Sequence, residues 1–380
     1  MASVQDEIIK PAQGTVATRI LVVRPDRIGD VILSTPAFEV LKRHYPRAHL
    51  TVMVREAVVP LLKGLPSVDD VLIFDPDGRH RGIGGFFQLI SDIREKKFYI
   101  AVVLQSHWKI AAALFGAGVR YRVGPLSKLH SFLFFNRGRR QRRSQVEMHE
   151  VDYNLQLLRR LGIRVGTRNV MPQVTSTEEM KEWGKNWLLE KGWKENEHLV
   201  VVHPGMGGSA LNWPENHYVE LIRALLKEGR KVLVTCGPSE GAVLGRIQEE
   251  LGQWKDKAYY YGGHGIGPVD RLTGLFNWAT LVIAPSTGPL HLAVALGKHV
   301  LCFYPPIAVQ SAIRWGPYSA DDTKSVILVP EVYCGEEFRC RGTLCNYFPC
   351  MKSLTVTQAL EEAQRQLARA EGEPSSASKV

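Results

Sequence analysis

The sequence of 380 residues lacks the features of an exported or membrane-spanning chain. No apolar run approaches the ~20 residues that a helix needs to cross a bilayer. The first segment, residues 1–17, carries Asp6, Glu7 and Lys10 and has no apolar core like that of a signal peptide. We therefore expect a cytoplasmic protein whose membrane involvement, if any, is peripheral.

Cysteine is scarce, and the sequence contains no Cys-x-x-Cys pair. Without an export signal a disulfide framework is not expected, and the cysteine spacing misses the usual pattern of zinc ligands. We expect a compact loop packed with thiols near the C-terminus, while a disulfide and a structural metal site stay open as alternatives. The cysteines of this loop are Cys334, Cys340, Cys345 and Cys350.

Two common signatures of nucleotide binding are also missing. No Gly-x-Gly-x-x-Gly follows the first predicted strand, which disfavours a dehydrogenase, and no Gly-Lys-Ser/Thr follows the glycine-rich turn near residue 205, which excludes a Walker loop. The charge distribution nevertheless predicts an anionic partner for the first half. Residues 1–170 hold 27 Lys and Arg against 15 Asp and Glu, a net +12, whereas residues 171–380 hold 21 against 23, a net −2.

Short apolar runs alternate with helical patterns along the chain, which predicts α/β units with parallel sheets. The expected fold class is α/β, with two Rossmann-like domains facing a cleft and ligands at the carboxyl ends of the strands. Residues 164–176, rich in Gly, Pro, Thr and Ser, are the expected linker. The expected parts are an N-terminal extension (1–18), an N-terminal domain (19–170), a C-terminal domain (171–355), a C-terminal helix (356–370) and a disordered tail (371–380).

One turn in the second half joins a strand end to a helix start. Ser286, Thr287 and Gly288 precede a helix that carries His291. Hydroxyls and backbone N–H groups at a helix start can hold an anion, and the helix dipole favours it. The alternative is an ordinary helix cap followed by a core histidine.

Two further turns of the same kind strengthen a nucleotide-binding interpretation. The glycine-rich sequence Met206-Gly207-Gly208-Ser209 follows His203, and its amides can cradle phosphate unless it is a flexible surface turn. Glu240 follows the next strand, where its carboxylate can accept hydrogen bonds from ribose hydroxyls or simply favour a helix start. Several such turns at parallel strand ends of one domain favour a nucleotide site.

In the first half, the turn 24–29 leads into a helix at Asp30. Gly29 permits a tight turn, and Asp30 is either the N-cap of the helix or a general base. Asp26 is the competing carboxylate, and arginines are expected to hold an anionic acceptor. The expected acceptor-binding residues are Arg24, Asp26, Arg27, Arg120 and Arg122.

A run of aromatic and aliphatic residues at 132–135 precedes a cluster of arginines. This pattern suits an anionic lipid surface. Nucleic acid is one alternative, and a buried strand followed by a solvated loop is another. We favour a membrane or lipid-linked partner, because the chain carries no known nucleic-acid module. The arginines are Arg137, Arg139, Arg140, Arg142 and Arg143.

Together these motifs resemble glycosyltransferase family 9, the ADP-heptose:lipopolysaccharide heptosyltransferases, which have the GT-B fold. The resemblance covers the chain from about Arg19 to Thr357. It rests on the Arg24–Asp30 turn with Ser34-Thr35-Pro36-Ala37, on His203-Pro204-Gly205 with Trp213-Pro214, on Ser286–Ala293, and on Cys350-Met351.

The resemblance implies a metal-independent, inverting transferase without a cofactor, located in the cytoplasm and peripherally associated with the inner membrane. It places a lipid-linked anionic glycan acceptor on the N-terminal domain and the nucleotide-sugar donor, ADP-heptose, on the C-terminal domain, with no nucleic acid as partner. Asp30 falls on the catalytic base of the family, and Glu240 on an acidic residue near the ribose. The residues on donor-binding positions are Met206, Gly207, Thr287, Gly288 and His291.

Two positions depart from the family pattern. Many members have Asp where this chain has Ser286, and members commonly have Lys or Arg just before the tryptophan, where this chain has Leu211 and Asn212. The departures bear on the nucleotide and the sugar rather than on the fold. The alternatives are a family member with another donor or acceptor, a nucleotide-sugar epimerase on the same fold, and a non-catalytic nucleotide-binding protein.

Overall fold

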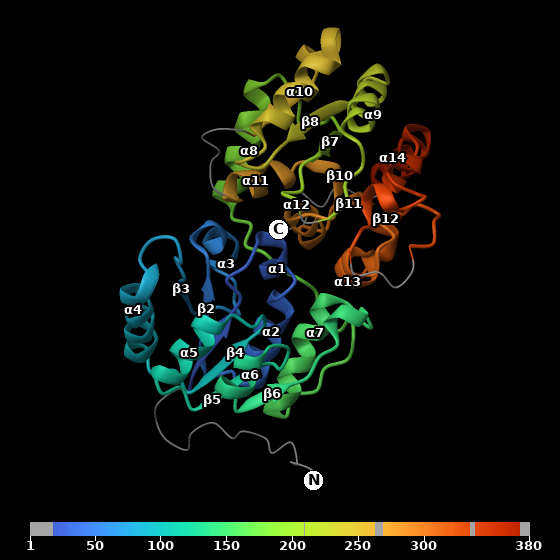
Figure 1. Cartoon of the computed structure of the whole chain (residues 1–380). Coiled ribbons are helices and arrows are strands. Elements are labelled where there is room, and N and C mark those ends of the chain that lie inside the picture. The colour runs from blue at the N-terminus through green and yellow to red at the C-terminus, as the bar shows by residue number, and fades with distance from the viewer. Residues whose placement is uncertain (1–17, 209, 263–268, 335–338, 373–380) are drawn as a thin grey trace. The chain divides into compact units, whose positions relative to one another are not determined.

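The computed structural model describes residues 18–208, 210–262, 269–334 and 339–372 (Figure 1). Ser209, nearly all of the expected N-terminal extension and most of the expected tail therefore lie outside the described residues. The chain divides into two compact units, Met1–Arg143 with Glu147–Thr175, and Ser144–Val146 with Ser176–Val380. The division after Thr175 lies a few residues beyond the expected boundary at 170. We call the units the N-terminal and C-terminal domains.

The N-terminal domain is built on a six-stranded sheet in which all described pairings are parallel. The strands are β1 (Arg19–Val23), β2 (His49–Val54), β3 (Asp70–Ile73), β4 (Ile100–Val103), β5 (Tyr121–Pro125) and β6 (Arg137–Arg139). Their order across the sheet is β3-β2-β1-β4-β5-β6. Ile20, Leu21, Val22 and Val23 have no exposed surface, as expected for a parallel sheet covered on both faces.

Helices alternate with these strands and bury the sheet (Figure 1). They are α1 (Ile28–Ile32), α2 (Thr35–His44), α3 (Val59–Leu62), α4 (Gly82–Glu95), α5 (Trp108–Gly116), α6 (Leu129–Phe134) and α7 (Glu150–Leu158). On one face of the sheet, Leu89 and Ile93 of α4 and Leu114 of α5 belong to the same apolar core as Val23 and Val103. The helix layer on that face is thus held by side chains from neighbouring strands.

The first helix of the domain is broken where the sequence predicts one continuous helix from Asp30. α1 ends at Ile32 and α2 begins at Thr35. Pro36 has no N–H group to donate to the carbonyl of Ile32. The hydroxyl of Thr35 donates to that carbonyl instead, at 2.8 Å. The break leaves Asp30 on a short helix of its own, next to the turn that follows β1.

The basic segment after residue 131 does not fit the alternative of a buried strand followed by a solvated loop. Phe132, Leu133 and Phe134 lie on α6, not on a strand. Arg137–Arg139 forms the edge strand β6 beside β5 rather than an irregular loop. Pairing with β5 stabilises this short strand, and the local sequence has no strand pattern of its own. No helix in the described ranges is both long and apolar enough to span a bilayer.

The C-terminal domain repeats the parallel architecture. Its strands are β7 (Leu199–Val202), β8 (Lys231–Thr235), β9 (Tyr259–Tyr261), β10 (Ala279–Pro285), β11 (His299–Phe303) and β12 (Ser325–Leu328), in the order β12-β11-β10-β7-β8-β9. Its helices are α8 (Glu178–Glu190), α9 (Glu215–Lys227), α10 (Gly241–Leu251), α11 (Val269–Phe276), α12 (Gly288–Ala295), α13 (Ala312–Trp315) and α14 (Val356–Glu371). The prediction of an α/β fold with two Rossmann-like domains is confirmed.

Trp213 joins the last helix of the chain to the core of this domain. It is 1% exposed, its ring stacks on Phe303 with centroids 4.3 Å apart, and its indole N–H donates to the carbonyl of Leu354 at 2.8 Å. α14 begins directly afterwards with a capping box formed by Thr355 and Gln358. The expected helix 356–370 therefore packs as part of the C-terminal domain.

The contact between α8 and α11 yields a stability prediction. A Cβ atom on Gly184 of α8 would overlap the backbone carbonyl of Gly274 on α11, and a backbone neighbour cannot rotate away. We expect Gly184→Ala to destabilise the C-terminal domain by ~1–3 kcal/mol through overpacking. The matched control is Gly245→Ala on α10, where nothing lies within 4 Å of the new Cβ. Because alanine favours a helix over glycine, the melting temperature of the control should stay or rise. Equal melting temperatures for both variants would contradict the proposed contact.

Candidate active site

The strand order reverses at one place in each sheet. In the C-terminal domain the chain runs outward from β7 through β8 to β9, then continues on the other side of β7 with β10, β11 and β12. In the N-terminal domain the reversal lies between β1 and β4. Open α/β sheets bind ligands outside the carboxyl ends of the strands at such a reversal. The turns after β7, β10 and β1 are therefore the expected ligand-binding positions.

The turn after β10 presents backbone N–H groups and hydroxyls at the start of α12. Thr287 is extended (φ −146°, ψ 165°), makes no side-chain cap, and is followed by Gly288 as the first helical residue. The first N–H groups of a helix have no partner within the helix and form a ready site for an anion. Ser286 hydrogen-bonds with the hydroxyl of buried Tyr304, and His291 is nearly buried one turn further along α12. The structure thus brings the predicted residues of this turn together.

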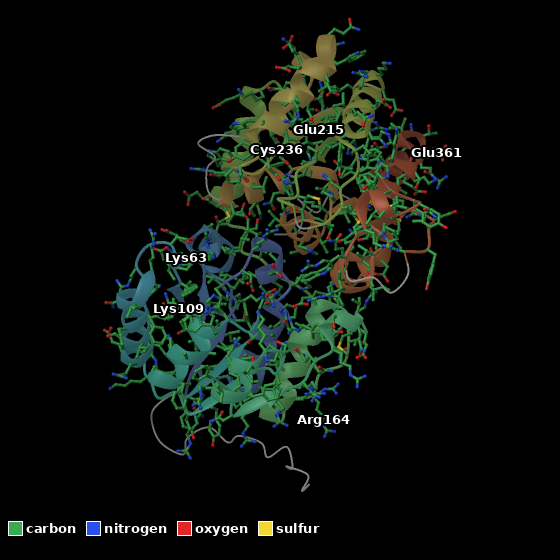
Figure 2. All side chains as sticks on the ribbon, viewed as in Figure 1. Lys63, Lys109, Arg164, Glu215, Cys236 and Glu361 are labelled. Carbon is green, nitrogen blue, oxygen red and sulfur yellow. The ribbon has the colours of Figure 1, made fainter. Side chains whose placement is uncertain are left out.

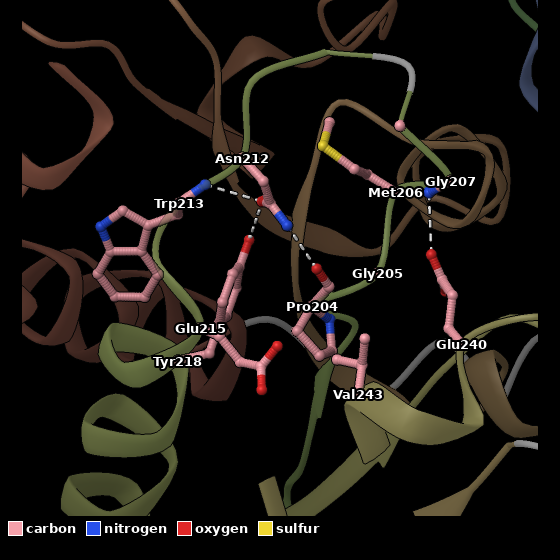
Figure 3. Close-up of a pocket in the computed structure, with 11 residues that line it drawn as sticks. Pro204, Gly205, Met206, Gly207, Asn212, Trp213, Glu215, Tyr218, Glu240 and Val243 are labelled. Atoms are coloured by element: carbon pink, nitrogen blue, oxygen red, sulfur yellow. Dashed lines mark hydrogen bonds between the residues drawn. The ribbon is translucent and has the colours of Figure 1, made fainter. Parts of the chain in front are cut away.

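The turn after β7 forms one wall of a cavity of about 260 Å³ (Figure 3). Gly207 and Gly208 have positive φ angles of 57° and 69°, which glycine adopts without strain. Asn212 donates from its amide to the carbonyl of Pro204 at 2.7 Å. The cavity is lined by Pro204, Gly205, Met206, Gly207, Gly208, Asn212, Trp213, Glu215, Tyr218, Glu240 and Val243.

Glu240 ties the turn after β7 to the turn after β8. One carboxylate oxygen accepts from the backbone N–H of Gly207 at 2.9 Å (Figure 3), and the other from that of Gly237 at 2.8 Å. Glu240 occupies the N-cap position of α10, but its side chain makes no cap hydrogen bond and contacts the two turns instead. A Cβ atom on Gly205 would overlap this carboxylate, so a larger residue there would displace Glu240 from its backbone contacts. Glu240 positions the turn and also faces the cavity.

His203 lies buried beneath the same turn. Its backbone N–H donates to Ile283 of β10 at 2.8 Å, and its Nδ1 lies 2.9 Å from the hydroxyl of Thr235 on β8. The residue therefore connects three adjacent strands, β10 through its backbone N–H and β8 through its side chain, at the level where their turns begin. Burial lowers the pKa of His203 to about 4, so the residue is neutral at physiological pH.

In the N-terminal domain, Arg24 is completely buried at the end of β1 and contacts three carboxylates. Its guanidinium lies 2.6 Å from Asp30, 2.9 Å from Asp26 and 3.1 Å from Glu150. Burial by itself would lower the pKa of Arg24, but the attraction of Asp30, Glu150 and Asp26 outweighs burial and raises this pKa. Burial raises the pKa of Asp26 as well. Asp30 keeps 21% of its side chain exposed, so the carboxylate is oriented from inside the domain and open to a ligand from outside.

A second layer of residues holds this cluster from α7. Glu150 has no exposed surface and lies 2.5 Å from Arg143 as well as 3.1 Å from Arg24. Asn154, one turn along α7, donates to the hydroxyl of Ser34 at 3.2 Å. That hydroxyl in turn donates to the backbone carbonyl of Asp30 at 2.7 Å. Glu150 and Asn154 are not predictable from the sequence, because a polar residue on a helical pattern is usually solvated and nothing local marks it as buried.

Three predicted acceptor-binding arginines need correction. Arg24 is enclosed by its carboxylates, so it positions Asp26 and Asp30 and does not contact an acceptor. Arg120 precedes β5 and Arg122 lies near its start, at the amino-terminal edge of the sheet, because Tyr121 pairs with Ile100 and Ile100 with Ile20. They lie at the edge opposite to Asp30. Arg122 also donates to the carbonyl of Phe134 at 2.6 Å.

The remaining predicted residues of this domain differ in how far they are exposed. Arg27, in the turn before Asp30, is exposed, and Asp26 keeps 22% of its side chain exposed. In the arginine run, Arg140 and Arg142 are exposed, whereas Arg137 and Arg139 are half-buried on β6. Arg143 points inward, where it pairs with Glu150 and donates to the carbonyl of Leu104 at 3.0 Å. The prediction of a surface role for Arg143 is therefore wrong.

The C-terminal cysteine loop forms no disulfide among the residues described. In the same residues, no three His, Cys, Asp or Glu side chains are grouped so that they would hold a metal ion. Burial and the neighbouring cysteines raise the pKa of Cys350.

Comparison with known proteins agrees with this fold. Residues 86–346 match glycosyltransferase family 9 (heptosyltransferase). A putative glycosyltransferase of Haemophilus influenzae is 29% identical over 323 residues, which cover 82% of this chain and 89% of that protein. The chain belongs to glycosyltransferase family 9, and it is a glycosyltransferase.

Solved structures share the whole architecture. A family 9 glycosyl transferase from Veillonella parvula superposes with a TM-score of 0.81 at 20% identity, over 94% of this chain and 99% of that one. The E. coli ADP-heptose lps heptosyltransferase II superposes with a TM-score of 0.76 at 22% identity, over 93% and 100% of the two chains. The resemblance inferred from the motifs is confirmed at the level of the family.

The charge cluster around Arg24 predicts that removing one buried negative charge lowers the stability of the N-terminal domain. In Glu150→Gln, the buried Arg24 and Arg143 lose a shared counter-charge, so we expect the N-terminal domain to be destabilised by ~3 kcal/mol. Glu147→Gln, at an exposed position three residues earlier, is the control and should change stability by less than ~0.5 kcal/mol. Thermal unfolding of both variants measures the difference. Similar melting temperatures for the two would show that Glu150 does not stabilise the cluster.

His203 predicts a specific loss of stability in acid. The folded-state pKa is about 4, below the unmodified value of 6.5, so between these values the unfolded chain binds more protons and unfolding becomes easier as pH falls. The full effect is roughly 3 kcal/mol, present above pH ~6.5 and lost as pH falls through ~4. We expect the stability difference between wild type and His203→Gln to shrink over this range in denaturant titrations. A difference that is constant with pH would contradict the assignment.

Proposed function

We propose that this protein is an inverting, metal-independent heptosyltransferase. It moves heptose from ADP-heptose to the inner core of a lipopolysaccharide or a similar lipid-linked anionic glycan at the cytoplasmic face of the inner membrane. Family membership supports sugar transfer, and a structural relative is named as an ADP-heptose lps heptosyltransferase. The observation that carries the proposal is the group of three turns that follow the adjacent strands β10, β7 and β8 in the C-terminal domain, two of which border the cavity.

The donor is assigned to these turns by the chemistry of each. Backbone N–H groups of Thr287 and Gly288, with the side chains of Ser286 and His291, hold the diphosphate at the start of α12. Gly207 and Gly208 offer further amides from the turn after β7. Glu240 accepts hydrogen bonds from ribose hydroxyls with the lone pairs that its two backbone contacts leave over. Such preorganised donors stabilise the charge that accumulates on the departing diphosphate.

The position before Trp213 carries no cation that could neutralise the diphosphate. Asn212 stands there, and its side chain holds the turn through Pro204 and through Tyr218, whose hydroxyl lies 3.1 Å from the amide oxygen. Neutralisation of the diphosphate therefore depends on amides and on α12 rather than on a lysine or arginine at this position. This is the reason to test other nucleotide sugars beside ADP-heptose.

Asp30 is proposed as the general base. It takes the proton from an acceptor hydroxyl while that oxygen forms a bond to the anomeric carbon, and the bond from that carbon to the diphosphate breaks, which releases ADP. The geometry supports this role, because Arg24 orients the carboxylate at 2.6 Å and leaves part of it exposed. Asp30 precedes the segment matched to the family, so the assignment rests on this geometry and on the Gly29-Asp30 motif.

The test is a donor and acceptor assay of wild type and Asp30→Asn. We expect ADP release from ADP-heptose that requires a lipid-linked acceptor, with lower turnover from UDP- and GDP-sugars. Without its base the variant should lose ~10²–10⁴-fold in kcat, while thermal shifts with ADP stay as in wild type. Asp77→Asn, at an exposed position, is the control.

Three outcomes would overturn parts of the proposal. Donor consumption without any acceptor would indicate an epimerase. Nucleotide binding without turnover that depends on Asp30 would indicate a binding protein. Full activity of Asp30→Asn together with loss of activity in Asp26→Asn would move the base to Asp26.

A further inference from the structure

Three neighbouring helices of the N-terminal domain expose large apolar side chains. α4, α5 and α6 together carry seven of the 16 large apolar residues that are exposed among those described, each between 52% and 83% exposed. Exposed apolar residues on soluble proteins are usually scattered singly, and a contiguous group marks an interaction site. The seven are Ile83, Phe87, Trp108, Phe115, Leu129, Phe132 and Leu133.

Spacing places these residues in one stripe on each helix. Ile83 and Phe87 are four residues apart on α4, and Leu129 and Leu133 are four apart on α6, so each pair shares a helix face. On α5, the exposed Trp108 and Phe115 lie two turns apart. None of these positions belongs to the buried core of the domain. Each helix thus has one face on the sheet and an apolar face in solvent.

The three stripes form one surface because the helices lie side by side. Arg94 of α4 donates to the carbonyl of Gly116 at the end of α5, at 2.7 Å. Phe115 of α5 and Phe134 of α6 have ring centroids 5.9 Å apart. Core residues of all three segments share one cluster on the same side of the sheet. Their exposed residues therefore point away from the sheet together, and we call them the apolar helix face.

The charge of this region is mainly positive. Residues 96–146 contain 11 Lys and Arg and no Asp or Glu. Lys128 and Arg120 are exposed next to α6 and α5, and Lys109, labelled in Figure 2, donates to the carbonyl of Gly82 at the start of α4. The acidic residues of α4 are Asp92, which is paired with Arg79 and His80, and Glu95, which is exposed at the end of the helix. A partner with an apolar layer beneath negatively charged groups is complementary to this surface.

We propose that the apolar helix face docks on an anionic lipid bilayer. The helices lie in the plane of the membrane, apolar side chains enter the boundary of headgroups and acyl chains, and the surrounding cations contact lipid phosphates. The contact thus centres on α4, α5 and α6 rather than on the arginine run, whose Arg143 is turned inward. The proposal extends the proposed function, since a lipid-linked acceptor lies in a membrane. Its test needs no turnover, so the two can fail separately.

The test is co-sedimentation of the full chain with vesicles of phosphatidylcholine, with and without about one third phosphatidylglycerol. We expect binding to the anionic vesicles that weakens when NaCl is raised from about 0.1 M to about 0.5 M. Leu129→Ser with Leu133→Ser should lower the affinity at least about tenfold, because each leucine loses its transfer into the bilayer. Lys128→Glu should weaken binding several-fold and reduce its dependence on salt.

The matched control is Leu189→Ser with Ile313→Ser, two exposed apolar residues of the C-terminal domain, which should bind vesicles like wild type. Unchanged melting temperatures and ADP binding show that both double variants are folded. Equal vesicle binding by the two would overturn the proposal. A dimer in light scattering that only Leu129→Ser with Leu133→Ser abolishes, without vesicle binding by wild type, would assign the face to a second copy. Binding of nucleic acid but not of vesicles would also overturn it.

Discussion

Parallel strand pairing is the constraint on which the candidate sites of both domains depend. Each parallel connection must return across the sheet through a helix, so the carboxyl ends of all strands meet at one edge. In the C-terminal domain this brings together the turns that contain Gly207, Gly237 and Thr287, although the first and last are 80 residues apart. The contact of Glu240 with two of these turns follows from strands β7 and β8 being neighbours. The anion-binding amides are a consequence of topology rather than of one motif.

The N-terminal domain uses the same edge for a different purpose. Its turn after β1 carries carboxylates, and a buried cation holds them. Arg24 and Arg143 face Asp26, Asp30 and Glu150, so two positive charges meet three negative ones, and burial raises the pKa of Asp26. A buried charge of this kind is stable only when its partners are all present. The orientation of Asp30 therefore depends on α7, more than a hundred residues further along the chain.

Local patterns in the sequence predict most of the strands and the turns that follow them, because apolar runs and glycine-rich turns are local signals. They do not predict which polar residues are buried. Arg24 in a turn and Glu150 on a helix look solvated in isolation, and only their pairing across 126 positions shows otherwise. The edge of the sheet at which Arg120 lies is likewise set by strand register. The short strand β6 exists because β5 offers a partner, while the helix break at Pro36 has a local signal.

The positively charged residues of the first half therefore fall into two groups. The buried arginines are matched by carboxylates and have a fixed geometry, whereas the cations around α4, α5 and α6 have no acidic residue among positions 96–146 to balance them. Salt screens exposed charges far more than buried ones. Ionic strength should therefore act on the attachment of the domain to an anionic surface and leave the orientation of Asp30 unchanged. An arginine run that looks uniform in the sequence is divided by the fold into Arg143, which pairs with Glu150, and Arg140 and Arg142, which are exposed.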